Sequence, residues 1–282
     1  MNAAARSSNG VDGLAVEGLV VRFGGLVAVN GQTLQAPRGR ITGLIGPNGA
    51  GKTTTFNACS GLLRPTSGTV HLFGEDVTGS TPHHRAQKGL GRTFQRMELF
   101  DSLTVRDNVS LGREAGLAGS KPWRHILGRR SDAGAVATSV EDAVAACGIR
   151  DLIDRRPADL STGQRRLVEL ARCIAGNYRL MLLDEPSSGL DKAETVVFGR
   201  ILRSLVETPG PKGEQRGILI VEHDMSLVMS VCDYIHVLDF GEPIFEGTAA
   251  EVGSSDIVRA AYLGSEAVEA GVPEDDRASA GM

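Results

Sequence analysis

The chain has 282 residues, of which 41% are hydrophobic and 23% are charged, as in an ordinary globular protein large enough to bury a full core. A net charge of −4 and an aromatic content of only 4% argue against a nucleic-acid partner. No apolar run reaches the roughly 18 residues of a membrane-spanning helix. Residues 1–13 also lack the apolar core of a signal peptide.

The first part of the chain alternates between strand-like and helix-like patterns. Residues 1–13 are small and polar and predict a flexible tail, whereas residues 14–23 alternate apolar and polar positions, as in a half-buried strand. Strand patterns continue to Gly46. We expect a helix over residues 52 to about 63, followed by a hairpin over residues 66–77.

The middle of the chain, from about residue 101 to residue 159, is more polar and has helical periodicity. Several turn-forming residues between positions 116 and 134 predict a flexible connection. Amphipathic helices are expected at residues 138–147 and 164–175. This part of the chain therefore predicts a helical insertion.

Short apolar strands return in the last third of the chain. Buried strands are expected at residues 179–184 and 217–222, a pair of strands at 234–248, and a disordered tail at 265–282. Continuous apolar strands that alternate with helices predict a mostly parallel sheet covered on both faces. We therefore expect one α/β domain over residues 14–264, with the helical insertion inside it.

A glycine-rich loop, GPNGAGKT at residues 46–53, stands between a predicted strand and a predicted helix and matches G-x-x-x-x-G-K-[ST]. Its glycines allow backbone N–H groups to close around phosphate oxygens at the start of a helix. Lys52 would reach the β- and γ-phosphates, and the Thr53 hydroxyl is suited to Mg²⁺. The alternative is a glycine-rich turn with an incidental lysine. The loop alone does not distinguish kinases, GTPases, helicases and transport ATPases.

Two adjacent acids, Asp184 and Glu185, follow the apolar run at residues 179–183. The carboxyl ends of parallel strands are where such sheets bind ligands. Asp184 is suited to hold the water shell of Mg²⁺, and Glu185 to polarise an attacking water. Taken alone, two acids before a proline would more often be a solvated turn.

His223 ends a second predicted strand, and Gln95 lies in the segment GRTFQRM. From the end of a strand in the same sheet, His223 could face a γ-phosphate, although a lone histidine is usually structural. Gln95 is a neutral group suited to contact metal or water, and by itself it indicates nothing.

The order of these motifs resembles that of ATP-binding-cassette (ABC) ATPases. The motifs are GPNGAGKT, the Gln95 segment, LSTGQ (160–164), LLDEP (182–186), SSGLD (187–191) and VEHD (221–224). The resemblance covers about residues 14–264. It implies a P-loop (RecA-like) ABC ATPase core with an antiparallel β subdomain, and an inserted helical subdomain at about residues 97–162. It also implies ATP and Mg²⁺ as cofactors.

The resemblance assigns roles to individual residues. The nucleotide-binding residues would be Phe23, Gly46, Pro47, Asn48, Gly49, Ala50, Gly51, Lys52, Thr53 and Thr54. The metal would be held by Thr53, Gln95 and Asp184, and catalysis would involve Glu185, His223 and Gln95. Phe23 stands where the family stacks an aromatic ring on adenine; the alternative is a core or strand-surface phenylalanine.

LSTGQ resembles the family's signature motif, which contacts the nucleotide bound to the opposite subunit. Its contacts would come from Ser161, Thr162, Gly163 and Gln164, with a D-loop formed by Ser188, Gly189, Leu190 and Asp191. The physical chemistry agrees, because Ser161 and the N-terminus of a helix beginning near Gln164 would form a second anion site. Two chains packed head to tail, with ATP between them, would complete both sites.

Thr162 departs from the usual family form, LSGGQ, in which a glycine stands at this position. A β-branched residue would be costly here if the backbone required a positive φ. We expect the Thr162 side chain to point away from the nucleotide.

Within the family, the sequence is most similar to the ATPases of branched-chain (hydrophobic) amino acid importers. The residues that carry this similarity are 23–31, 91–109, 221–248 and 257–264. The resemblance implies separate membrane permease subunits, a second ATPase subunit and an external solute-binding protein. The chain would then be peripheral, on the cytoplasmic face of the inner membrane.

The segment from Phe94 to Phe100 would form the groove that receives a permease helix. Met97, Leu99 and Phe100 could equally belong to a local core.

Other functions remain open at this point. The same architecture could serve urea, an amide or another solute, and lipopolysaccharide-export ATPases are more distant relatives. A soluble ABC ATPase, such as a cluster-assembly protein, is a different class. An unrelated P-loop kinase or GTPase would leave LSTGQ and VEHD without a role. The sequence does not decide between a homodimer and a heterodimer.

Overall fold

The computed structural model describes residues 10–93, 99–118, 130–210 and 213–262. Gln95, most of the predicted N-terminal tail and all of the predicted C-terminal tail lie outside these residues. Within the described part of the chain, no helix has the length and apolar character needed to cross a membrane.

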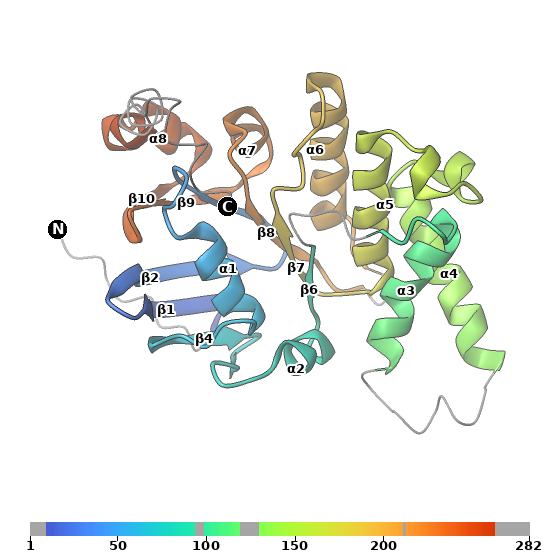
Figure 1. Cartoon of the computed structure of the whole chain (residues 1–282), viewed down its shortest axis with the longest axis horizontal. Helices are drawn as coiled ribbons and strands as arrows, with labels where there is room; N and C mark the ends of the chain where they lie inside the picture. Colours follow the sequence, from blue (N-terminus) through green and yellow to red (C-terminus); the bar gives the residue numbers. More distant parts are fainter. Residues whose placement is uncertain (1–9, 94–98, 119–129, 211–212, 263–282) are drawn as a thin grey trace, which may run out of the picture.

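A six-stranded sheet in the order β10-β9-β3-β8-β7-β6 forms the centre of the molecule (Figure 1). The strands are β3 (Ile41–Ile45), β6 (Leu90–Arg92), β7 (Leu180–Asp184), β8 (Gly217–Val221), β9 (Tyr234–Asp239) and β10 (Glu242–Gly247). All neighbouring pairs are parallel except β9 and β10, which are antiparallel. The predicted mostly parallel sheet is confirmed.

The central strands are buried on both faces, as their continuous apolar sequences predict. Every residue of β3, β7 and β8 is buried. Alternate residues enter different cores: Leu180 and Leu182 pack with the antiparallel sheet and α1 (Lys52–Ser60), whereas Met181 and Leu183 pack with the other helices. Except for the buried Thr42, the polar side chains lie at or just beyond the ends of these strands.

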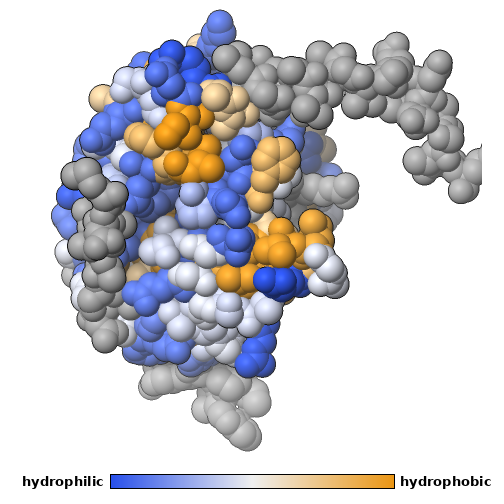
Figure 2. Space-filling view, turned by 90° about the vertical axis from the view of Figure 1, so that its left-hand side faces the viewer, coloured by the Kyte–Doolittle hydropathy of each residue, from blue (hydrophilic) through white to orange (hydrophobic). Residues whose placement is uncertain are grey.

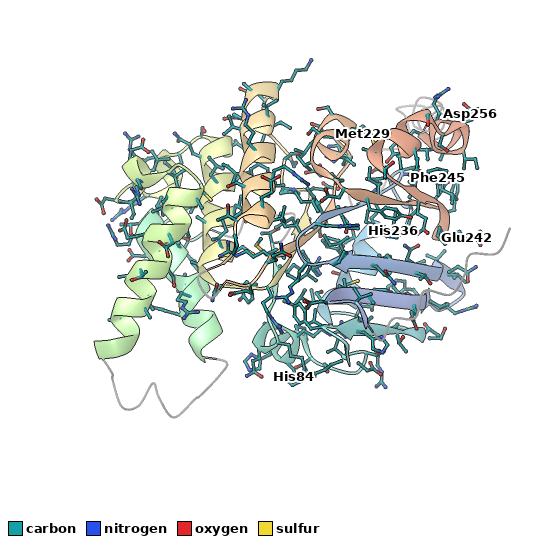
Figure 3. All side chains as sticks on the ribbon, turned by 180° about the vertical axis from the view of Figure 1, so that it is seen from behind. His84, Met229, His236, Glu242, Phe245 and Asp256 are labelled. Carbon is teal, nitrogen blue, oxygen red and sulfur yellow. The ribbon has the colours of Figure 1, made fainter. Side chains whose placement is uncertain are left out.

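A second sheet is antiparallel, in the order β2-β1-β4-β5. Its strands are β1 (Gly13–Phe23), β2 (Leu26–Pro37), β4 (Ser67–Leu72) and β5 (Glu75–Asp76). The β4–β5 pair corresponds to the hairpin predicted at residues 66–77. The β1–β2 hairpin lies beside β10 of the central sheet, where the Asn30 side chain donates to Glu242 at 3.0 Å; Figure 3 labels Glu242 near the outer end of this hairpin.

The remaining helices surround the central sheet. They are α2 (Pro82–Gln87), α3 (Val105–Ala118), α4 (Arg130–Ala146), α5 (Thr162–Ala175), α6 (Lys192–Glu207), α7 (Met225–Val231) and α8 (Ala249–Ser254), with short 3-10 turns at Arg150–Leu152 and Pro157–Asp159. Helices α3, α4 and α5 pack on one another at one side of the molecule, and α6, α7 and α8 lie along one face of the sheet (Figure 1).

Three predicted boundaries were wrong. Helix α1 ends at Ser60 rather than near residue 63, because Gly61 takes a left-handed conformation, with φ 82°, that stops the helix. Helix α4 begins at Arg130 rather than at residue 138, so part of the predicted connection at 116–134 is helical. Helix α5 begins at Thr162 rather than near residue 164.

Candidate functional site

The glycine-rich loop lies between the end of β3 and the start of α1. Gly46 and Gly51 have φ of 154° and 94°. A Cβ on Gly46 would lie 2.1 Å from the Leu238 carbonyl oxygen, and one on Gly51 would lie 2.6 Å from that of Ala28. Only glycine therefore fits at these two positions, and the surrounding strands fix the shape of the loop.

Lys52, the first residue of α1, turns its side chain into this loop. It is only 7% exposed, and Nζ donates to the carbonyl oxygens of Gly46 at 2.6 Å and Pro47 at 2.9 Å. Burial lowers the pKa of Lys52, and the nearby carboxylates of Glu185 and Asp184 oppose this shift. The ammonium group is therefore held within the loop, on the side of the two acids.

The N-terminus of α1 is open to an anion. Its N-cap is Gly51, which has no side chain to satisfy the first backbone N–H groups of the helix. Thr53 is exposed in the first turn, Thr54 is half-buried, and Asn48 is exposed in the loop. Free N–H groups, a helix dipole and a lysine at one loop suit phosphate oxygens.

Asp184 and Glu185 stand at the end of β7, where the sequence placed them. Asp184 is 3% exposed and accepts a hydrogen bond from Arg92 Nη2 at 3.0 Å. Burial raises the pKa of Asp184, and Arg92 opposes that shift. Glu185 has a left-handed backbone, with φ 46°, and its side chain is 20% exposed.

His223 joins this pair from the end of β8. Its Nδ1 lies 4.0 Å from Glu185 Oε2 and 4.0 Å from Glu222 Oε2, and its side chain is 59% exposed. The structure therefore brings Glu185 and His223 together at one edge of the sheet, beside the glycine-rich loop that follows β3.

Glu222 was missed from the sequence, although it lies inside the VEHD motif. It is fully buried, and its carboxylate accepts from Ser187 N at 2.8 Å and from His223 N at 3.2 Å. Burial raises the pKa of Glu222, and these hydrogen bonds oppose the shift. Glu222 thus connects the turn after Glu185 to the strand that carries His223. The sequence signal that could have identified Glu222 is an acidic residue directly after an apolar strand pattern.

The signature segment forms the N-terminus of α5. Ser161 and Gln164 make a capping box: Ser161 Oγ accepts from Gln164 N at 3.2 Å, and Gln164 Oε1 accepts from Ser161 N at 3.1 Å. Thr162 begins the helix and is not among the residues with a positive φ, so its β-branched side chain causes no backbone strain.

The D-loop packs against the signature segment of the same chain. A Cβ on Gly189 would lie 2.9 Å from Thr162 Cγ2, and one on Gly163 would lie 2.3 Å from Glu194 Oε1. Asp191 caps α6 and accepts from Glu194 N at 2.8 Å, and Leu190 packs against the helical core. Two capped helix N-termini therefore meet at this point.

The glycine-rich loop and the signature segment are apart within one chain. Figure 1 shows α1 and α5 on different sides of the molecule, with β7 and β8 between them. Within one chain, the glycine-rich loop therefore lies on the side of Asp184, Glu185 and His223, and the signature segment lies away from it.

Phe23 and Gln95 are the remaining predicted site residues. Phe23 ends β1 and is 51% exposed, which rules out a core phenylalanine and leaves a strand-surface or adenine-stacking residue. Figure 2 faces the side where the β1–β2 hairpin and β10 lie, and shows separate apolar patches among hydrophilic side chains. Gln95 lies outside the described residues, so its predicted role stays a prediction.

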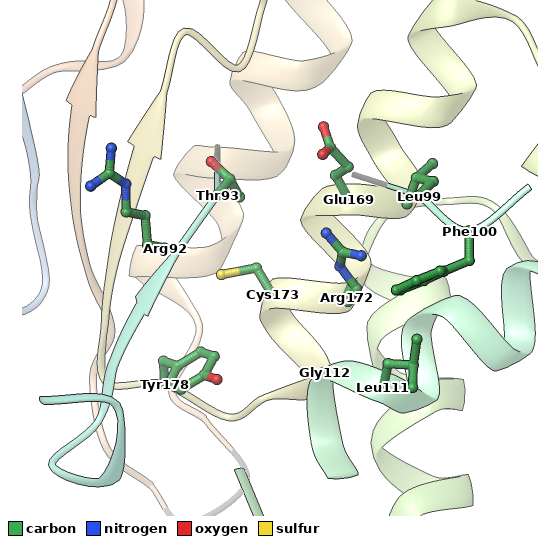
Figure 4. A pocket seen from close by; sticks show the side chains of 10 residues that line it. All are labelled: Arg92, Thr93, Leu99, Phe100, Leu111, Gly112, Glu169, Arg172, Cys173 and Tyr178. Atoms are coloured by element: carbon green, nitrogen blue, oxygen red, sulfur yellow. The ribbon is translucent and has the colours of Figure 1, made fainter. Parts of the chain in front are cut away.

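A cavity of about 510 Å³ lies between the end of β6 and helices α3 and α5 (Figure 4). Its lining residues are Arg92, Thr93, Leu99, Phe100, Leu111, Gly112, Glu169, Arg172, Cys173 and Tyr178. Leu99 and Phe100, from the predicted permease groove, are among them, and Phe100 is 53% exposed.

The residue types predicted to hold a cation suit a hard ion such as Mg²⁺. Asp184 has a carboxylate and Thr53 a hydroxyl, and both types of oxygen are ligands that Mg²⁺ accepts. Among the described residues, no group of three or more His, Cys, Asp and Glu side chains forms a metal site of its own. A cation here would therefore share phosphate oxygens of a nucleotide, as Mg²⁺ commonly does.

The sequence model described as "ABC transporter" matches residues 29–188, more than half of the chain. The chain belongs to the ABC transporter family. The ATP-binding cassettes of this family bind and hydrolyse ATP, and the fold found here is that of such a cassette.

Curated relatives of this ABC protein match it along most of its length. The high-affinity branched-chain amino acid transport ATP-binding protein BraF of Pseudomonas aeruginosa is 36% identical over 260 residues, which cover 89% of this chain and 97% of BraF. LivG of Escherichia coli, described in the same words, is 35% identical over 259 residues, with the same coverage. The lipopolysaccharide export system ATP-binding protein LptB of Acidithiobacillus ferridurans is 32% identical over 240 residues, covering 85% of this chain and 92% of LptB.

Solved ABC cassettes have the same fold. An ATP-binding cassette of an ABC transporter in its ADP conformation is 28% identical, with a TM-score of 0.74, and covers 89% of this chain and 98% of its own. The cassette cbiO1 from Clostridium perfringens, part of an ABC transporter complex, is 26% identical, with a TM-score of 0.72, and covers 90% of this chain and 96% of its own.

The buried acid Glu222 gives a prediction about stability and pH. Because its pKa is raised in the folded chain, the stability it contributes is present when it is protonated and is lost as pH rises from its usual value of 4.5 through the raised value. Glu222→Gln stays neutral at every pH; its amide oxygen can keep the bond from Ser187 N, whereas its amide nitrogen loses the bond from His223 N. Relative to the wild type, we therefore expect the variant's free energy of unfolding to rise between pH 4 and pH 8, by about 1 kcal/mol.

Urea denaturation at pH 4, 6 and 8 measures this difference. Glu207→Gln is the control, because Glu207 is an exposed acid paired with Arg203 and should show no such gain at pH 8. A Glu222→Gln variant whose stability relative to the wild type does not rise from pH 4 to pH 8 would contradict the prediction.

Proposed function

We propose that this chain is the ATP-hydrolysing subunit of an ABC importer for branched-chain or other hydrophobic amino acids. The observation that carries ATP hydrolysis is the placement of Glu185 and His223 beside the Lys52 loop, at one edge of the sheet. The choice of solute rests on the similarity to BraF and LivG along nearly their whole length.

In this proposal the loop binds the phosphates of ATP. The backbone N–H groups after Pro47 in the loop and in the first turn of α1, together with the Lys52 ammonium, would hold the β- and γ-phosphates, and the exposed ring of Phe23 would stack on adenine. Asp184, Thr53 and Gln95 would hold Mg²⁺, which, when bound, neutralises charge on the phosphate oxygens.

Glu185 is the proposed group that polarises the attacking water. Its carboxylate is partly exposed beside His223, so a water at the γ-phosphate could reach both side chains. His223 would face the γ-phosphate, and its backbone N–H is tied to Glu222. The chain thereby orients the water and the phosphate without forming a covalent intermediate.

A second subunit completes the proposed site. Since α1 and α5 lie on different sides of one chain, ATP on the loop would be reached by the signature segment of a partner packed head to tail. The Ser161 hydroxyl accepts one hydrogen bond from Gln164 and can still donate its own proton to a phosphate. The N–H groups at the start of α5 would add an anion site.

The proposed membrane partners are separate permease subunits. The cavity beside α3 and α5 has an apolar wall formed by Leu99, Phe100 and Leu111, which suits an apolar helix end. The chain would then lie on the cytoplasmic face of the inner membrane, with an external solute-binding protein acting through the permease.

Glu185→Gln tests the assignment of the catalytic carboxylate. We expect ATP binding to persist and hydrolysis to fall by about 100-fold or more, because the amide cannot take a proton from water. ATP should also hold the variant in a stable dimer with its partner subunit, as light scattering after gel filtration would show. Glu207→Gln should hydrolyse ATP normally, and a Glu185→Gln variant that does the same would refute the role.

Ser161→Arg tests whether the signature segment acts on the partner's nucleotide. A bulky cation there should block hydrolysis while the ATP affinity of the isolated subunit stays near normal. Thr248→Arg is the matched control, because Thr248 caps α8 through the same kind of capping box, away from the signature segment. If Ser161→Arg weakened ATP binding by the isolated subunit, the segment would act within its own chain.

The solute is tested on the native complex. The tagged chain is purified from detergent-solubilised membranes, and the solute-binding protein encoded with its permease partners is titrated with leucine, urea and an amide by calorimetry. We expect multi-span partners, a second ATPase subunit and binding of leucine. Binding of urea or the amide alone would reassign the solute, and a complex with only soluble partners would reject the importer.

A further inference from the structure

Arg92, the last residue of β6, is a largely buried arginine that is not among the predicted site residues. Its side chain is 9% exposed, and that of its partner Asp184 is 4% exposed. Strands β6 and β7 are parallel, with Arg92 paired to Leu182, so the guanidinium lies alongside the end of β7. An ion pair this well buried is costly to form, and a carboxylate that lost its partner here would be strongly destabilised.

The guanidinium connects three elements. Nη2 donates to Asp184 Oδ2 at 3.0 Å, and Nη1 donates to Asn57 Oδ1 at 2.8 Å and to Ser60 Oγ at 2.7 Å. Asn57 and Ser60 belong to α1, whose first residue is Lys52. Arg92 therefore fixes the carboxylate of β7 relative to the helix that begins at the glycine-rich loop.

The backbone next to Arg92 strengthens this connection. Thr93 N donates to the Leu182 carbonyl oxygen at 2.9 Å, and Thr93 Oγ1 accepts from Asp184 N at 3.4 Å. Arg92 lies at the wall of the 510 Å³ cavity, but Figure 4 shows its guanidinium pointing away from Phe100 and Leu111 across that cavity. The guanidinium is therefore placed to bind Asp184 and not a group inside the cavity.

We propose that Arg92 is a positioning residue that holds the Asp184 carboxylate for Mg²⁺, so that the gain in ATP affinity from Mg²⁺ depends on Arg92. This inference rests on the proposed function, in which Asp184 and Thr53 hold the metal. The hydrogen bond from Arg92 to Oδ2 restricts the rotation of the Asp184 carboxylate, and so it also restricts the position of the other oxygen, Oδ1. Groups that orient a metal ligand in this way typically contribute about 10- to 100-fold to metal affinity.

The test compares ATP affinity in Mg²⁺ with ATP affinity in EDTA, by calorimetry on the full chain. For Arg92→Met we expect the Mg²⁺-dependent gain to fall by about 10-fold or more, with affinity in EDTA changed less than about twofold. Arg92→Lys, which keeps the charge but not the forked contacts, should lose part of the gain. If Arg92→Met does not fold, the Lys variant decides the outcome.

Arg85→Lys is the matched control. Arg85 is 1% exposed and also bonded to α1, but its guanidinium donates to the backbone carbonyl oxygens of Ala58 and Cys59, both at 2.7 Å. This variant should lower the melting temperature and keep the full Mg²⁺-dependent gain.

Two results would overturn the inference. Arg92 variants that keep the full gain would reject its positioning role while leaving the proposed function intact. A wild-type chain that binds ATP in neither condition would reject both. Lys52→Ala, which should bind ATP in neither condition, confirms that the calorimetric signal comes from the glycine-rich loop.

Discussion

The burial of the central strands on both faces is the constraint on which the rest of this molecule depends. Apart from the buried Thr42, strands β3, β7 and β8 carry only apolar side chains or glycine up to Asp184, the last residue of β7, so polar chemistry is confined to the strand ends and the residues that follow them. Because these strands are parallel neighbours, their carboxyl ends meet at one edge. The strand packing therefore brings together the glycine-rich loop, Asp184, Glu185 and His223, which come from distant parts of the sequence. No local sequence pattern links them.

The same constraint explains which parts of the fold and site were predictable. Continuous apolar runs identified the buried strands, and the motifs at their ends placed Lys52, Glu185 and His223 correctly at the sheet edge. Arg92 and Glu222 were not assigned roles, although both lie in quoted segments. Their roles depend on contacts with Asp184 and Ser187. Neither hydrophobic periodicity nor the spacing of motifs predicts contacts between residues that are far apart in the sequence.

Helix boundaries were missed for a different reason. Hydrophobic periodicity marks the packed middle of a helix, whereas capping groups decide its ends. Ser161 and Gln164 have the spacing of a capping box, which would have placed the start of α5 at Thr162. Gly61 was likewise a readable stop for α1. The start of α4 at Arg130 had no comparable signal, because the preceding sequence is rich in turn formers.

The backbone at Glu185 shows how the strand beside it shapes the site. A glutamate with φ 46° is strained, and such a conformation persists only where the surroundings hold it. Here Glu185 N donates to the Val221 carbonyl oxygen of β8 at 2.9 Å, and Ser188 N donates back to the Glu185 carbonyl oxygen at 3.1 Å. Glu222, next along the chain after β8, binds Ser187 N within the same turn. Strand β8 therefore supplies His223 and also the contacts that keep Glu185 in its strained conformation, so a shift of β8 would move both side chains together.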